Sequence, residues 1–218
     1  LPLKIGNRVV GVMTIAFVVA RDFQETELRA LRLLATQAAI AIENAHLYDQ
    51  VQQLAVTDSL TGLFNRRGFN QIGAIEFDRA WRFDRPLAAM MLDVDHFKLV
   101  NDKYSHAVGD KVLIALAEAC RHCVRTVDVV GRWGGEEIVI LLPEAGTDIA
   151  VRVAERLRAA VENMRVPANG AEVGVTISVG VAIMTHETAD LNLLIARADQ
   201  AQYRAKEAGR NKVVVIGK

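Results

Sequence analysis

Cysteine and proline are scarce in this chain of 218 residues, which contains two cysteines and four prolines. The cysteines, Cys120 and Cys123, form one CRHC motif, and no second cysteine pair is present to complete a four-ligand zinc site. We therefore interpret them as thiols of a helix, buried or half-buried. So few cysteines in a chain of this length are typical of a reducing compartment, and we expect a cytoplasmic protein.

An excess of charge of one sign is also missing, as are long apolar runs. Lysine plus arginine equals aspartate plus glutamate, 26 against 26, so nothing favours general binding to nucleic acid or to a membrane surface. The longest apolar stretch, 9–20, is shorter than the roughly 20 residues that a membrane-spanning helix needs. The chain begins LPLKIG, without an initiator methionine or a charged leader. We expect a fragment of a longer protein without a secretion signal, and membrane attachment of the parent stays open.

The composition, with 51% hydrophobic and 24% charged residues, is that of a folded protein with one domain and an attachment. Residues 1–24 contain two β-branched runs joined at Gly6-Asn7, which indicates a hairpin. Residues 25–56 have apolar positions at helical spacing without glycine or proline, which predicts a helix of about 30 residues. Asp22 or Thr26 would cap it.

This predicted helix carries a seam of small residues, namely Ala35, Ala38, Ala41 and Ala45. Such a seam favours close pairing with a second helix, and we expect the partner to be an identical chain. The alternative is that the seam packs against the chain's own first domain.

From residue 57 to 218 the pattern alternates between helices and strands. Helices are predicted at 68–83, 110–124, 148–164 and 191–208, and strands at 87–94, 127–133, 137–142, 173–184 and 212–216. Because hairpins are included, we expect an α/β fold with a mixed sheet flanked by helices. Gly180 is predicted to form a bulge or kink, and Gly209 a left-handed helix end.

The first candidate site is LDVDHFKLVND. Asp93 and Asp95 lie two residues apart at the end of a buried strand, so both are expected on the same face. Carboxylates there suit Mg²⁺, which prefers oxygen ligands, and Lys98 would meet a phosphate. A solvated turn between strand and helix is the alternative.

The second candidate site is RWGGEEIVILL, in which Gly134-Gly135 predicts a type I′ hairpin turn. Glu136 and Glu137 follow, and adjacent strand residues face opposite ways, so one of them would join Asp93 on a metal. The glycines would let a phosphate or a base approach the backbone. A bland hairpin with solvated glutamates is the alternative.

The third candidate site is AKEAGRNK, in which Lys206 and Arg210 lie at the end of the last predicted helix. Both would reach phosphate oxygens. The alternative is that these cations only complement the helix dipole.

Four motifs, DSLTGLFNRRGF, LDVDHFKLVNDKYSHAVGDKVL, GRWGGEEIVILLP and ADQAQYRAKEAGRNKV, occur in the order and spacing of the GGDEF family, the diguanylate cyclases. The resemblance covers about 57–218. It implies a ferredoxin-like core related to the polymerase palm, in a bacterial protein that condenses two GTP into cyclic di-GMP with release of two pyrophosphates. Residues 1 to about 46 resemble the C-terminal part of a GAF sensor domain, so residues 1–24 would be the last strands of a truncated GAF-like domain.

The resemblance also implies roles for individual residues. Asp93 and Glu137 would bind Mg²⁺ or Mn²⁺, two ions per active site, with help from the carbonyl of Val94. Glu136 would be the second metal ligand or the general base for the 3′-hydroxyl. The remaining substrate contacts would come from the guanine readers Asn101 and Asp110 with His106 nearby, the phosphate-binding Lys98, Lys206 and Arg210, the backbone N–H groups around His96 and Phe97, and the glycines Gly134 and Gly135.

Two GTP molecules require two subunits, so the resemblance implies a homodimer in which each subunit presents its 3′-hydroxyl to the other's α-phosphate. Asp110 favours plain cyclic di-GMP, because a subgroup that makes mixed cyclic dinucleotides has serine there. Arg125 and Asp128 resemble the family's inhibitory RxxD site, which binds the product, and Arg156 matches a secondary arginine of that site. An ordinary surface ion pair is the alternative.

Three residues depart from the family's usual pattern: Ile138 replaces phenylalanine, Ser105 replaces glycine, and His96 replaces a common aromatic residue. None removes a ligand, so we expect an effect on rate and packing. Two rival functions stay open. One is a catalytically silent module that binds GTP or cyclic di-GMP and relays a signal. The other is a nucleotidyltransferase acting on nucleic acid, for which the chain lacks a basic patch.

Overall fold

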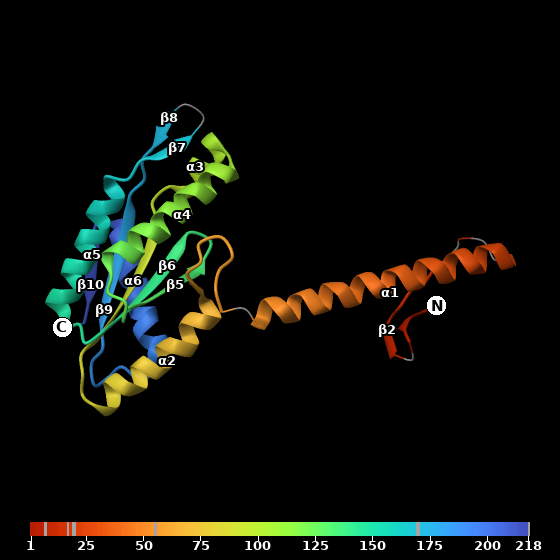
Figure 1. The fold of residues 1–218 in the computed structure, drawn as a ribbon, viewed down its shortest axis with the longest axis horizontal. Helices are drawn as coiled ribbons and strands as arrows, with labels where there is room; N and C mark the ends of the chain where they lie inside the picture. Colours follow the sequence, from red (N-terminus) through yellow and green to blue (C-terminus); the bar gives the residue numbers. More distant parts are fainter. Residues whose placement is uncertain (7, 17, 19–20, 55, 169–170, 218) are drawn as a thin grey trace. The chain divides into compact units, whose positions relative to one another are not determined.

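The computed structural model describes residues 1–6, 8–16, 18, 21–54, 56–168 and 171–217, and of residues 46 and 48–54 the backbone alone. The chain divides into two compact units, Leu1–Ala55 and Val56–Lys218. Figure 1 labels their helices and strands. In the described residues, no helix combines the length and the apolar character needed to cross a bilayer.

The first unit is a hairpin packed on a helix. Strands β1 (Pro2–Ile5) and β2 (Arg8–Val12) pair antiparallel, as expected, and Asn7 of the predicted turn lies outside the described residues. Helix α1 spans Glu25–Leu54, which confirms a helix of 30 residues. It begins after Gln24, whose backbone N–H donates to the Glu27 carboxylate. The predicted caps, Asp22 and Thr26, are therefore wrong, because Asp22 lies two residues before Gln24 and Thr26 lies inside the helix.

The alanine seam of α1 is shared between two environments. Ala35 is buried against Leu3 of β1, and Ala38 packs beside it, so this half covers the chain's own hairpin. Ala41 and Ala45 are exposed to solvent. The alternative of packing within the chain thus holds for the first half of the seam.

The second unit is built on a six-stranded mixed sheet in the order β10-β9-β4-β6-β5-β3. Its strands are β3 (Phe64–Asn65), β4 (Leu87–Val94), β5 (Val129–Gly134), β6 (Glu137–Pro143), β9 (Ile177–Ile183) and β10 (Val213–Ile216). A separate hairpin joins β7 (Val166–Ala168) to β8 (Ala171–Val173). The central strand β4 is buried along its whole length, as its apolar run predicts.

Five helices of this unit flank the sheet (Figure 1): α2 (Arg66–Arg82), α3 (Phe97–Tyr104), α4 (His106–Cys123), α5 (Thr147–Glu162) and α6 (Leu191–Glu207). Helices α4 and α5 pack against Met90 and Leu92 of β4, whereas α2 and α6 pack against Ala89 and Met91. Side chains alternate along a strand, so Asp93 belongs to the face covered by α2 and α6. The expected α/β fold with a mixed sheet is confirmed.

Gly180 does not form the predicted bulge, because β9 keeps an unbroken register with β4 on both sides of it. Its missing side chain instead lets α6 approach the sheet. A Cβ atom at Gly180 would lie 2.1 Å from the carbonyl oxygen of Ala198 and 2.1 Å from the amide nitrogen of Gln202. Gly209 follows α6 with φ +103°, which confirms the left-handed helix end.

The segment between β4 and α4 differs most from expectation. Residues 97–104, part of a predicted turn, form α3, and α4 begins at His106 instead of Asp110. Ser105 joins the two helices with φ 100°, a conformation that favours glycine. The family's usual glycine at this position is thereby explained, and the serine is held in a strained conformation. Cys120 and Cys123 are buried in α4, as predicted.

Candidate active site

Two carboxylates face each other at one end of the sheet. Asp93 of β4 pairs with Glu137 of β6 in antiparallel register, so their side chains are neighbours on one face. Burial raises the pKa of Asp93, the charges of Glu136 and Asp95 add to the rise, and Lys206 opposes it. Burial likewise raises the pKa of Glu137, followed by the negative charges of Asp93 and Asp199. These carboxylates therefore need a cation when ionised.

Lys206 supplies positive charge to this pair. Its Nζ lies 2.8 Å from Oδ2 of Asp93, whose side chain is only 8% exposed, whereas that of Lys206 is 32% exposed. The sequence predicts Lys206 as a phosphate ligand, and the structure places it on a carboxylate. Among the described residues, no three histidine, cysteine or acidic side chains lie close enough together to hold a metal ion.

The glycine turn differs from the predicted type I′ hairpin. The register of β5 and β6 shifts between Arg132 and Gly134, and Gly134 pairs with Glu137, so Gly135 and Glu136 form the turn. Neither glycine has the left-handed φ that a type I′ turn requires. The shift at Trp133 is the physical reason, because it moves the turn one residue along. Glu136 is consequently a turn residue, and the predicted alternation of Glu136 with Glu137 does not apply.

Arg132 fixes this turn. Its guanidinium donates through Nε and Nη2 to the carbonyl oxygen of Gly135, at 2.9 and 2.7 Å, and through Nη1 to Asp58. Asp58 also accepts from the hydroxyl of Thr61, 2.6 Å away. Arg132 and Asp58 each belong to one of the sequence motifs, but only the fold shows that their side chains form an ion pair.

Asp95 does not join Asp93 as a ligand, contrary to the expectation of a shared face. Its carboxylate accepts hydrogen bonds from Thr176 Oγ1 at 2.6 Å, Ser178 Oγ at 2.7 Å and the backbone N–H of Asn211 at 3.0 Å. Asp95 lies just past the end of β4, where strand alternation no longer applies. The carboxylate thus connects β4 to β9 and to the residues before β10.

A second part of the site lies where α3 meets α4. The side-chain Oδ1 of Asn101 is buried and has no hydrogen-bond partner. A Cβ atom at Gly109 would lie 2.0 Å from this oxygen, and 3.1 Å from Cζ of Phe97, so only glycine fits. Asp110 follows Gly109 on α4 and is exposed, as is His106. Asp110 thus follows directly the glycine that the Asn101 side chain approaches.

The remaining predicted phosphate ligands are exposed cations and backbone groups. In the described part of the chain, the side chains of Lys98 and Arg210 make no ion pair. His96 precedes α3 with φ 57° and provides no side-chain cap to the amides of the first turn, the part of a helix at which anions are favoured. Ile138 is 1% exposed and pairs with Leu92 of β4, so the residue that replaces phenylalanine belongs to the packed interior.

Comparison with known proteins identifies the family. The model of the diguanylate cyclase GGDEF domain matches residues 55–212. This chain belongs to the GGDEF family. A GAF domain model matches residues 1–43, which agrees with the resemblance expected over residues 1 to about 46.

Individual relatives of this GGDEF protein agree with the family match. Diguanylate cyclase A of Treponema denticola is 32% identical over 219 residues, 98% of this chain and 58% of the relative. The chain thus spans a little over half of that protein. The GGDEF domain of DgcB from Caulobacter crescentus, solved in complex with c-di-GMP, has a TM-score of 0.71 and 28% identity, over 74% of this chain and 95% of that one. The active GGEEF domain of a diguanylate cyclase from Vibrio cholerae has a TM-score of 0.67 and 32% identity, over 71% and 97%.

The RxxD residues of this GGDEF domain are paired with each other. Arg125 Nη2 lies 2.7 Å from Oδ1 of Asp128, whose side chain is 1% exposed, and it also donates to the carbonyl of Pro143. The hydrogen bond to Asp128 raises the pKa of Arg125. Arg156 donates to the carbonyl oxygen of Cys123 at 2.6 Å. The Arg156 side chain therefore binds the backbone two residues before the RxxD motif.

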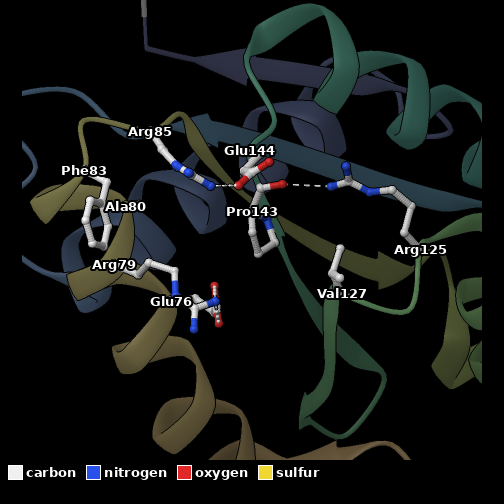
Figure 2. Close-up of a pocket in the computed structure, with 9 residues that line it drawn as sticks. All are labelled: Glu76, Arg79, Ala80, Phe83, Arg85, Arg125, Val127, Pro143 and Glu144. Carbon is white, nitrogen blue, oxygen red and sulfur yellow. Dashed lines mark hydrogen bonds and ion pairs between the residues drawn. The ribbon is translucent and has the colours of Figure 1, made fainter.

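Arg125 borders a surface pocket of about 520 Å³ that the sequence analysis missed. Figure 2 shows two more arginines in its wall, Arg79 of α2 and Arg85. Each has an acidic partner: Arg79 pairs with Glu76 at 3.0 Å, and Arg85 pairs with Glu144. Arg156 is not part of this wall. Only the fold brings Arg79 to the RxxD motif, because no pattern links residues so far apart.

Proposed function

We propose that this chain is a diguanylate cyclase that condenses two GTP into cyclic di-GMP and releases two pyrophosphates. The observation that carries the proposal is the register of Asp93 with Glu137, which puts two oxygen-donor side chains together beside the glycine turn. Nucleotidyl transfer needs positioning and neutralisation of charge more than covalent help from the protein.

A divalent metal suits these residues. Burial raises the pKa values of the Asp93 and Glu137 carboxylates, and neighbouring negative charges add to both rises, so a cation would stabilise both in their ionised form. The residues that would hold Mg²⁺ or Mn²⁺, two ions per site, are Asp93, Glu137, Glu136 and the carbonyl of Val94. The bound ions would neutralise triphosphate charge and favour an ionised 3′-hydroxyl. Glu136 serves as second ligand or as base for that hydroxyl.

The guanine would bind between α3 and α4. Asn101 has a buried acceptor without a partner, and Asp110 next to it accepts from the N1–H and N2–H₂ edge that adenine lacks. His106 lies nearby. Lys98, Lys206 and Arg210 bind the phosphates, together with the amides of His96 and Phe97, and Gly134 and Gly135 leave room for the nucleotide. The proposed product is plain cyclic di-GMP.

The active species is a homodimer, because each subunit supplies one GTP and ring closure needs two. The exposed second half of the α1 seam and neighbouring apolar residues support pairing of two copies: Leu33, Leu34, Ile40 and Ile42 are more than two-fifths exposed. Pairing raises the local concentration of the partner site. GTP and its cyclic product place this reaction in the bacterial cytoplasm.

Product inhibition would act through Arg125 and Asp128. Arginines stack on guanine and form paired hydrogen bonds with phosphate, and three of them border the pocket at the RxxD motif. Arg156 supports the motif through its hydrogen bond to the carbonyl oxygen of Cys123.

Incubating the chain with GTP and Mg²⁺, and separating the products, tests the proposal. Cyclic di-GMP should form, and Asp93→Ala and Glu136→Ala should abolish it, whereas Asp78→Ala, an exposed acid on α2, should leave turnover unchanged. Binding of GTP without product at high protein concentration would favour the silent module instead.

A further inference from the structure

The ion pair between Lys206 and Asp93 has a consequence for metal binding. We propose that the Lys206 ammonium is an internal counterion of the nucleotide-free site, and that a metal ion binds Asp93 only by displacing this ammonium, which a bound triphosphate would then receive. This inference rests on the proposed function, because it assigns Asp93 to the metal and Lys206 to the phosphates.

The charges around Asp93 explain why a counterion is needed. The negative charges that act on Asp93 come from Glu136 and Asp95, and those acting on Glu137 come from Asp93, Asp199 and Glu136. Lys206 is the cation that acts on both carboxylates. At 2.8 Å, its ammonium lies against Oδ2 of Asp93, one of the two oxygens of the proposed metal-binding carboxylate. Two cations at one oxygen repel, so metal and ammonium compete.

Lys206 is built to leave. It lies in the last turn of α6, its side chain is 32% exposed, and lysine carries a compact charge on a flexible stem. By contrast, Asp93 is nearly buried and fixed in β4, between β6 and β9. When a triphosphate enters, the ammonium gains a new anionic partner, and the carboxylate becomes available to the metal.

Metal and triphosphate are therefore positively coupled. The metal alone binds weakly because it must release an ammonium into water, whereas in the presence of triphosphate the ammonium moves to another anion. By linkage, the triphosphate tightens metal binding by the same factor as the metal tightens triphosphate binding. Removing the ammonium should tighten metal binding in the absence of nucleotide and thereby reduce this coupling. The arrangement therefore weakens metal binding as long as nucleotide is absent.

The test is a titration of the nucleotide-free chain with Mn²⁺, with free Mn²⁺ measured by electron paramagnetic resonance. Lys206→Met should bind Mn²⁺ on the order of tenfold more tightly than the unaltered chain, as loss of a close, partly buried cation implies. Lys206→Arg should bind like the unaltered chain because it keeps the charge. Lys98→Met is the matched control, because it removes another proposed phosphate-binding lysine that forms no ion pair with Asp93. The Mn²⁺ affinity of this variant should change less than twofold.

Three results would overturn the inference. The first is no gain in Lys206→Met, checked to be folded by its thermal transition; the second is an equal gain in Lys98→Met. If either result is found while Asp93→Ala still abolishes GTP turnover, the inference fails but the proposed function is retained. The third is a gain that persists in Lys206→Met with Asp93→Asn, which would place the metal elsewhere and contradict the metal assignment as well. Loss of the gain in that double variant supports the inference.

Discussion

Arg132 and Asp58 are 74 residues apart in the sequence, and Nη1 of the arginine lies 3.1 and 3.2 Å from the two carboxylate oxygens of the aspartate. The same guanidinium holds the carbonyl of Gly135. The turn that carries Glu136 is thereby tied to the segment that opens the second unit. Removing either partner should affect both folding and catalysis.

The Asp58 carboxylate makes stability depend on pH. Burial alone would raise its pKa, but hydrogen bonds from Thr61 and Arg132 outweigh burial and hold the pKa below its usual value of 3.8. An acid with a lowered pKa in the folded state contributes stability above its unfolded pKa, and this is lost as pH falls through the folded pKa. Urea unfolding should therefore show Asp58→Asn to be less stable by about 1–3 kcal/mol near neutral pH. This difference should shrink below about pH 4. A difference independent of pH, or one equal to that of Asp78→Asn, would contradict this account.

Replacing Gly135 should separate folding from substrate binding. A Cβ atom there would meet nothing within 4 Å, and the backbone conformation is open to alanine. We expect Gly135→Ala to melt within about 1 °C of the unaltered chain, since no contact is lost. Its GTP turnover should fall by roughly tenfold or more, because the methyl group enters the space of the nucleotide. Gly146→Ala, equally free of contacts but at the start of α5, is the control and should keep full turnover. A fully active Gly135→Ala would show that the nucleotide does not approach this turn.

Ser105 carries a measurable strain. With φ 100° it occupies a region that glycine tolerates and other residues rarely adopt. Ser105→Gly should raise the free energy of unfolding by about 1 kcal/mol, as measured by urea denaturation. Ser105→Ala serves as the comparison, since it keeps the Cβ atom and should bring no gain. Because Ser105 separates α3 from α4, relief of strain also offers a direct test of whether this joint limits turnover.

Arg125 should link inhibition to stability. Arg125→Ala should relieve inhibition by added cyclic di-GMP while initial turnover stays within about twofold, because the pocket lies apart from Asp93 and Glu137. It should also lower stability by roughly 1–2 kcal/mol, since the nearly buried Asp128 loses its side-chain partner. Arg82→Ala removes an arginine of α2 outside the pocket and should change neither property. Unaltered inhibition in Arg125→Ala would make the motif a structural ion pair only.

Sequence patterns predicted the elements of the second unit well, because long buried runs such as 87–94 and periodic stretches such as 191–208 have few alternatives. They failed where local rules compete. The eight residues of α3 are too short and polar for periodicity to distinguish from a turn. A bulge at Trp133 has no sequence signal, so the turn type was wrong.

The candidate site was predicted residue by residue mainly from the family resemblance. Alternation placed Asp93 correctly, since it lies inside a strand, but misplaced Asp95, which lies beyond it. The pairing of Lys206 with Asp93, the anchoring of Arg132 by Asp58, and the arginine-lined pocket depend on contacts between distant segments. These contacts follow from the packing of α6 and α2 on the sheet and from the pairing of β3 with β5, which the sequence pattern does not encode locally.

Asp95 places a single side chain at the junction of three segments, since its two oxygens receive Thr176, Ser178 and the backbone of Asn211. Arg210 is the chain neighbour of Asn211, so this junction also restrains the backbone beside Arg210. A substitution that loosened this junction would shift Arg210 relative to Asp93 and Glu137 without altering any of these three residues. Substitutions at Asp95, Thr176 or Ser178 are accordingly expected to impair turnover even though the proposed nucleotide-binding residues are unchanged.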